Sequence, residues 1–142
     1  MKHLIVGGFF VAGLILAGCA KSPTKQEFSA REAQCLRCYC SSNAPAAERA
    51  LLDCADYARR CQEAGVEGIP YNQVFARIYG RLYLVERHLG NSGAAEQYLE
   101  KYARYHAVAS TQARQTGRPH GEMEALIIQK FDQGLQVAWK PQ

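Results

Sequence analysis

The feature that most constrains the fold is a helical repeat of apolar side chains between Tyr71 and Leu89. The apolar positions recur three or four residues apart: Val74, Phe75, Ile78, Tyr79, Leu82, Val85 and Leu89. The charged side chains of the segment lie off this stripe: Arg77, Arg81, Glu86 and Arg87. This spacing predicts an amphipathic helix with one buried face. Gly90 follows at the point where a helix commonly ends.

A second helix should follow from Gly93 to about Gln112, with Asn91 or Ser92 as its cap. Its apolar stripe comprises Ala95, Tyr98, Leu99, Tyr102, Tyr105 and Ala109. Because the connection is so short, the two helices must lie antiparallel.

A last helix is predicted from about Gly121 to Val137, after a turn at Thr116 to Pro119. Its apolar side would present Met123, Ile127, Phe131 and Leu135. The chain shows no strand-like alternation, so we expect an all-α fold, a small bundle of antiparallel helical hairpins.

The five cysteines that could form disulfides lie closer to the N-terminus: Cys35, Cys38, Cys40, Cys54 and Cys61. A short helix is predicted to begin with Ser29 as its cap and Glu32 three residues later, as in a capping box. Ser41 to Pro45 should break it, and a second helix should run from Ala46 to Ala64, closed by Gly65. Ala20 to Phe28 is mostly polar and reads as a flexible tether.

In an exported chain, five such cysteines indicate disulfides that staple the N-terminal part of the bundle. We expect no metal, because Cys54 and Cys61 lie nearly two helical turns apart and cannot chelate one ion from a single turn. We expect no cofactor, because Tyr39 stands where a haem attachment would need His.

Two pairings remain open. If the chain before Pro45 runs back extended, Cys40 comes level with Cys54 and Cys38 with Cys61, which leaves Cys35 unpaired. If that chain is helical, Cys35 comes level with Cys54 instead. We predict that both Cys54 and Cys61 are oxidised, with partners among Cys35, Cys38 and Cys40, which leaves one free thiol among those three.

No enzyme signature stands out, so we expect no catalytic residues. His88, His106 and His120 fit no metal or triad spacing. Tyrosines are more numerous on the two central helices than one small core needs. We therefore predict an outward patch for partner binding, the composition of protein-binding hot spots, from Arg81, Tyr83, Arg87, Arg104 and Tyr105.

The first nineteen residues describe an export signal: basic Lys2, an apolar run from Leu4 to Ile15, then Leu16-Ala17-Gly18-Cys19. These last four residues resemble the lipobox of bacterial lipoproteins. The resemblance implies cleavage after residue 18, acylation of Cys19 with fatty acids such as palmitate, and anchoring in a membrane. Ala20, rather than Asp, after the lipidated Cys implies the outer membrane, facing the periplasm.

The resulting organisation is a signal peptide at 1–18, a lipidated tether at 19–28 and one domain at 29–142. The chain has formal charge +4, and losing Lys2 leaves 16 basic and 13 acidic side chains, or +3. This mild surplus is spread along the chain, so we expect no nucleic acid as a partner.

Residues 69–109 resemble one tetratricopeptide repeat, a helical hairpin that often binds proteins. Gly80-x-x-Tyr83 is similar to its first helix and Ala95-x-x-x-Leu99 to its second, although Tyr79 replaces the expected Leu and no Pro ends the unit. We expect a protein-binding adaptor or assembly factor of the cell envelope, similar in architecture to the pilotins of secretion systems. The alternatives are a thiol–disulfide active protein using Cys35 and Cys38, and a structural lipoprotein with no specific partner.

Overall fold

The computed structural model describes residues 21–41, 43–109 and 127 of the 142-residue chain. It has four helices: α1 Lys25–Cys40, α2 Ala44–Glu63, α3 Tyr71–His88 and α4 Ser92–Ala109. The described residues contain no strand, which confirms the all-α class. Cys19, the turn at 116–119 and almost all of the last predicted helix lie outside the described residues.

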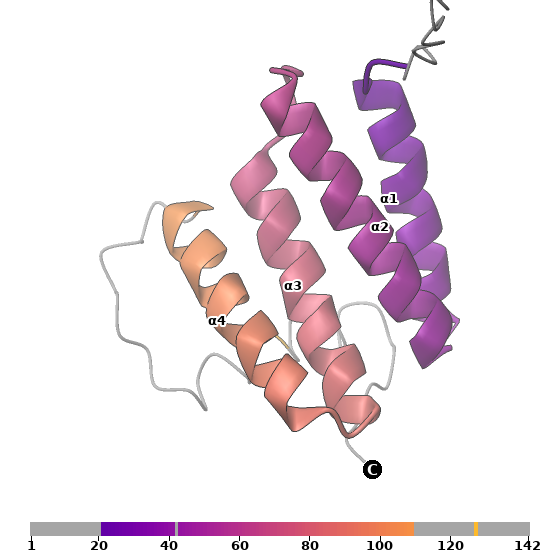
Figure 1. The fold of residues 1–142 in the computed structure, drawn as a ribbon, viewed down its shortest axis with the longest axis vertical. Helices are drawn as coiled ribbons and strands as arrows, with labels where there is room; N and C mark the ends of the chain where they lie inside the picture. The colour runs from indigo at the N-terminus through magenta and orange to yellow at the C-terminus, as the bar shows by residue number, and fades with distance from the viewer. Residues whose placement is uncertain (1–20, 42, 110–126, 128–142) are drawn as a thin grey trace, which may run out of the picture.

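The four helices run alternately up and down and lie side by side (Figure 1). The main contacts join consecutive helices, α1 to α2, α2 to α3 and α3 to α4, and the last pair is the most extensive. The predicted antiparallel hairpin of α3 and α4 is therefore confirmed. Gly65 and Gly90 end α2 and α3 with φ of 69° and 78°, a left-handed conformation that glycine adopts without a steric penalty.

The first helix begins earlier than the sequence predicted. Thr24, rather than Ser29, is its cap: the Thr24 hydroxyl accepts a hydrogen bond from the Glu27 amide at 3.2 Å. Thr24 is itself held, because its backbone N–H donates to the Tyr57 hydroxyl at 3.1 Å. Phe28 is only 4% exposed. The helical segment 25–28 thus belongs to the domain and not to a tether.

Small side chains on α2 allow its neighbours to approach closely. Asn43 caps this helix through the Ala46 amide at 3.1 Å, and Pro45 occupies its first turn, where a missing N–H costs nothing. The buried face of α2 consists mainly of alanine and cysteine, with two larger residues: Ala44, Ala47, Leu51, Cys54, Ala55, Tyr57, Ala58 and Cys61.

Helix α3 is the centre of the core and is buried on nearly every side. Twelve of its residues are buried: Val74, Phe75, Ala76, Ile78, Tyr79, Gly80, Arg81, Leu82, Tyr83, Leu84, Val85 and Glu86. The predicted stripe is therefore only part of its buried surface. Leu89, the last residue of that stripe, lies just beyond the helix and is 36% exposed. Ile127, predicted to face the core, is helical and fully buried.

Candidate functional site

Two cysteines from neighbouring helices meet in the core. Cys35 in α1 and Cys54 in α2 are neighbours, close enough for a hydrogen bond between their thiols to shift both pKa values, and these residues are 2% and 0% exposed. This is the pairing expected when the chain before Pro45 is helical. All five cysteines of the described residues carry free thiols in this structure.

The surroundings of the pair make its two thiols unequal. The hydrogen bond from Cys54, together with the positive charge of Arg81, lowers the pKa of Cys35. The same hydrogen bond, together with burial, raises the pKa of Cys54. Arg81 is 9% exposed and its guanidinium lies over the Tyr39 ring at 5.5 Å. Cys35 is therefore the thiol favoured as thiolate, the form that attacks disulfides.

The pairing expected for an extended chain is wrong, because Cys35 to Cys40 are helical. The antiparallel packing places Cys61 at the opposite end of α1 from Cys38, where the Cys61 sulfur lies 4.0 Å from the Thr24 carbonyl oxygen. Cys61 is buried, and this burial raises its pKa. Cys40 is exposed at the end of α1. In this fold no cysteine of α1 lies next to Cys61. The structure therefore does not support disulfide bonds at both Cys54 and Cys61.

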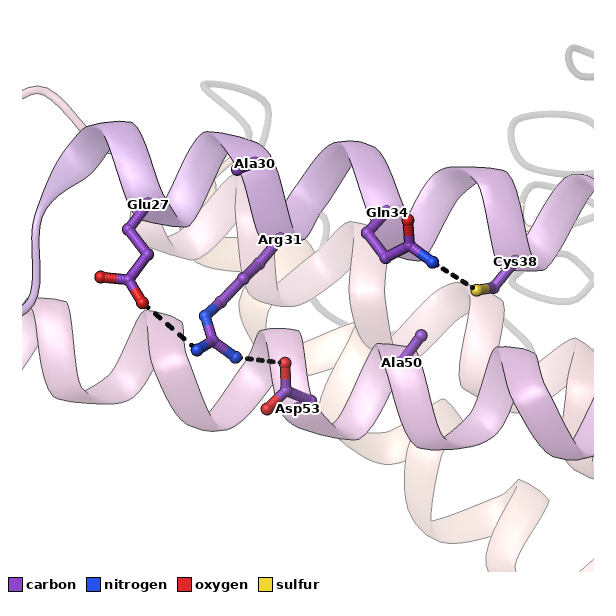
Figure 2. A pocket seen from close by; sticks show the side chains of 7 residues that line it. All are labelled: Glu27, Ala30, Arg31, Gln34, Cys38, Ala50 and Asp53. Atoms are coloured by element: carbon purple, nitrogen blue, oxygen red, sulfur yellow. Dashed lines mark hydrogen bonds and ion pairs between the residues drawn. The ribbon is translucent and has the colours of Figure 1, made fainter.

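A groove runs along the outer surface between α1 and α2, with a volume of about 410 Å³ (Figure 2). It is lined by Glu27, Ala30, Arg31, Gln34, Cys38, Ala50 and Asp53. Arg31 bridges the two helices, with its guanidinium 3.3 Å from Glu27 and 2.6 Å from Asp53. Farther along, Gln34 Nε2 donates to Cys38 Sγ at 3.4 Å. Sequence reasoning missed this groove, since its polar side chains come from two segments whose relative orientation was open.

The predicted outward patch is wrong for its central residues. Tyr83 is 1% exposed and Arg81 is buried beside Cys35, because α3 packs against neighbours on both sides. Arg87 is half-buried, and its guanidinium lies 5.6 Å from the centre of the Tyr83 ring. Of the five predicted residues only Arg104 is exposed, and Tyr105, like Arg87, is half-buried.

Tyr105 belongs instead to a cluster that we call the aromatic face: Phe75, Tyr79, Tyr98, Lys101 and Tyr105. The Tyr79 ring stacks on Tyr98 at 5.9 Å and on Tyr105 at 5.7 Å, while Phe75 meets Tyr105 at 4.9 Å. Lys101 Nζ lies 5.2 Å and 5.5 Å from the centres of the Tyr79 and Tyr98 rings, within cation–π range.

Helix α2 adds a second cation near this cluster, because Arg59 lies close enough to Tyr79 to act on its pKa. Burial raises the pKa of both Tyr79 and Tyr98, so these hydroxyls stay protonated at neutral pH. Tyr98 and Tyr105 are half-buried, whereas Arg59 and Lys101 are exposed. The aromatic face therefore offers ring surface and positive charge to the outside.

Two of the histidines lie in the part of the chain that the structure describes. His88 is in the last turn of α3, and His106 stacks on Tyr102 at 5.3 Å. His120 lies outside the described residues. Within residues 21–41, 43–109 and 127, no three potential metal ligands among His, Cys, Asp and Glu gather into one group. The helices described here also include none with the length and apolar character needed to cross a membrane.

Comparisons of the chain with protein-family models, with curated proteins and with solved structures find no match.

Proposed function

We propose that this protein is a lipid-anchored helical adaptor of the bacterial cell envelope, held in the outer membrane and facing the periplasm. The lipobox-like Leu16 to Cys19 supports the anchor. Acyl chains contribute roughly 0.8 kcal/mol per buried methylene, so two or more of them give stable attachment. The domain that they hold acts by binding another envelope protein and not by catalysis.

The observation that carries this proposal is the aromatic face. Partly exposed tyrosines beside cations have the composition of binding hot spots, in which a few aromatic and arginine anchors supply most of the affinity. Tyr98 and Tyr105 present ring surface on a rigid helix pair, and Lys101 and Arg59 set a positive charge beside them. The partner segment that fits this surface carries apolar side chains flanked by Asp or Glu.

The resemblance to a tetratricopeptide repeat and a disulfide between α1 and α2 are also part of this proposal. The residues that resemble a tetratricopeptide repeat, Gly80, Tyr83, Ala95 and Leu99, are all buried, as expected if they pack the hairpin. The helices also contact mainly their neighbours in sequence, which is typical of repeat proteins. A Cys35–Cys54 disulfide would staple α1 to this hairpin array through α2.

The test is site-specific photocrosslinking in intact cells. A photoreactive residue at Tyr105 should give a discrete crosslinked protein in the envelope fraction, and the same residue at the exposed Arg49 of α2 should not. Adding Lys101→Ala to the Tyr105 variant should reduce the crosslink. Equal crosslinking from both positions, or none from Tyr105, would contradict the proposed surface.

Affinity for the crosslinked protein then gives a quantitative check. Tyr98→Ala should weaken binding by about tenfold or more if Tyr98 is a hot-spot anchor. Arg49→Ala is the matched control and should leave the dissociation constant unchanged. Circular dichroism of each variant shows whether the fold has been kept.

A further inference from the structure

Three thiols form a path from the surface into the core. Cys38 lines the groove between α1 and α2 and is half-buried. Cys35 lies three residues before it, so the two side chains are neighbours on the same face of α1. Cys54 follows on α2, buried in the same core cluster as Cys35 and close enough to shift its pKa. Because Cys35 and Cys54 are 2% and 0% exposed, an external reagent meets Cys38 first.

We infer that Cys38 is the exchange thiol through which the buried Cys35–Cys54 pair is oxidised and reduced, and that the groove receives the external disulfide or dithiol. This inference rests on the proposed Cys35–Cys54 staple and adds the route by which the staple forms. The external reagent belongs to the class of disulfides, R–S–S–R, either small or protein-borne.

Oxidation proceeds by three exchanges. The Cys38 thiolate attacks R–S–S–R, forming a mixed disulfide on Cys38 and releasing the first thiolate R–S⁻. The Cys35 thiolate then attacks Cys38 Sγ, forming a Cys35–Cys38 bond and releasing the second R–S⁻. Finally Cys54 loses its proton and attacks Cys35 Sγ, so that Cys38 leaves as thiolate and takes up a proton. The net change oxidises Cys35 and Cys54, while R–S–S–R gains their two electrons and two protons and leaves as two R–SH.

The surroundings of Cys35 and Cys38 suit their steps. Arg81 and the Cys54 thiol both favour the thiolate of Cys35, the attacking group in the second exchange. The Gln34 amide donates to Cys38 Sγ at 3.4 Å and so stabilises that sulfur when it leaves in the third exchange.

The geometry of α1 favours transfer of the disulfide away from Cys38 and toward Cys54. Side chains three apart on a helix have Cβ atoms about 5–6 Å apart, whereas a relaxed disulfide needs about 3.8 Å. A Cys35–Cys38 bond within α1 is therefore strained and easily broken. Cys54 lies beside Cys35 on the next helix and can accept the bond. The stable product should therefore be the Cys35–Cys54 disulfide between α1 and α2.

The remaining cysteines supply controls. Cys40 lies five residues after Cys35, which turns it to another side of α1, and it is exposed. Cys61 is buried at the other end of α1, beside Thr24. Neither is on the path, so serine at either position should leave the exchange unaffected.

The experiment uses the full chain, purified in detergent, reduced, and then mixed with oxidised glutathione. Samples are quenched in acid at intervals, alkylated, and mapped by peptide mass spectrometry. Cys38→Ser should slow formation of the Cys35–Cys54 bond by at least about tenfold, because exchange rates depend on access to the thiol. Cys40→Ser should form the bond at the parental rate. Cys35→Ser should accumulate glutathione on Cys38.

The outcomes separate this inference from the proposal on which it rests. If the bond forms equally fast in Cys38→Ser and in the parent, the exchange role is wrong and the staple stands. If glutathione appears on Cys40 rather than on Cys38 in Cys35→Ser, the path is also wrong. If no Cys35–Cys54 bond forms in the parent, both the staple and the path fail. Crosslinking from Tyr105 tests the adaptor proposal independently of all three outcomes.

Discussion

The side-chain carboxyl groups of Glu48 in α2 and Glu86 in α3 lie close enough for a hydrogen bond between them to raise the pKa of Glu48. Glu86 is 2% exposed, and its Oε2 also accepts from Asn91 Nδ2 at 2.8 Å. The Asn91 backbone N–H donates to the Glu86 carbonyl at 2.9 Å, so Glu86 ties the α3–α4 turn to α2. Two carboxyl groups bond directly only when one of them holds a proton. Burial, and then the bond to Glu86, raise the pKa of Glu48.

This acid pair should make stability fall as the pH rises. Because the folded state holds the Glu48 proton more tightly than the unfolded state, its contribution is fully present below the ordinary pKa of 4.5. That contribution is lost as the pH rises through the raised pKa of the folded protein. Glu48→Gln keeps a donor toward Glu86 and cannot ionise, so it should raise the free energy of unfolding at pH 7, by no more than about 1 kcal/mol because solvent screens the half-buried Glu48 side chain.

Urea unfolding of the parent and Glu48→Gln between pH 4 and pH 8 tests this, with the exposed Glu63→Gln as control. The difference between the parent and Glu48→Gln should widen toward neutral pH. Parallel pH profiles for these two proteins would show that Glu48 holds no extra proton in the folded state.

The burial of Tyr83 predicts that this residue supports the fold. Tyr83→Ala should cost about 3–5 kcal/mol of stability, the range for large aromatic side chains in cores, and Leu82→Ala about 2–5 kcal/mol. Arg104→Ala, on the exposed side of α4, should change stability by no more than about 0.5 kcal/mol. Thermal melts of the three variants decide the matter. A Tyr83→Ala protein as stable as the parent would place this ring outside the core.

Reduction of the proposed Cys35–Cys54 bond should destabilise the protein by about 3 kcal/mol, the chain-entropy value for a loop of this size. The check is urea unfolding with and without a reducing agent. Cys61→Ser should keep this difference, and Cys35→Ser should abolish it. A parent that unfolds at the same urea concentration in both conditions would contradict the staple.

The proposed lipidation at Cys19 predicts that Cys19→Ser leaves an unprocessed precursor that takes up no labelled fatty acid. Gel mobility and radiolabelled palmitate report the two effects. The matched control is Cys40→Ser, which removes an exposed thiol of the domain and should be processed as the parent is. Equal labelling of Cys19→Ser and the parent would show that the anchor lies elsewhere.

The sequence predicted the α3–α4 hairpin well because its signals are local. The apolar spacing around Leu82 and the glycine at 90 determine a helix and its end without reference to the rest of the chain. The first helix was placed too late for a similar reason. Thr24 and Ser29 each precede a glutamate by three residues, and only the packing of Phe28 against the domain distinguishes the two caps.

The outward patch was wrong because periodicity assumes a single buried face. Helix α3 packs between α2 and α4, so Arg81 and Tyr83 are buried although they lie off the strongest stripe. The cysteine pairing depended on whether residues 35–40 are helical, which local sequence left undecided. The aromatic face was foreseen only as a surplus of tyrosines, because its rings come together across two helices.

The early start of α1 limits how far the domain could stand from a membrane. For a chain anchored at Cys19, only residues 20–24 precede the first helical turn, and a fully extended chain spans at most about 3.3–3.6 Å per residue. This linker of residues 20–24 is thus roughly 17 Å long when fully extended. The Thr24 backbone is hydrogen-bonded to Tyr57, which keeps the start of α1 from unwinding and so from lengthening this linker. If the chain is anchored at Cys19, its partner must therefore meet it close to the membrane surface.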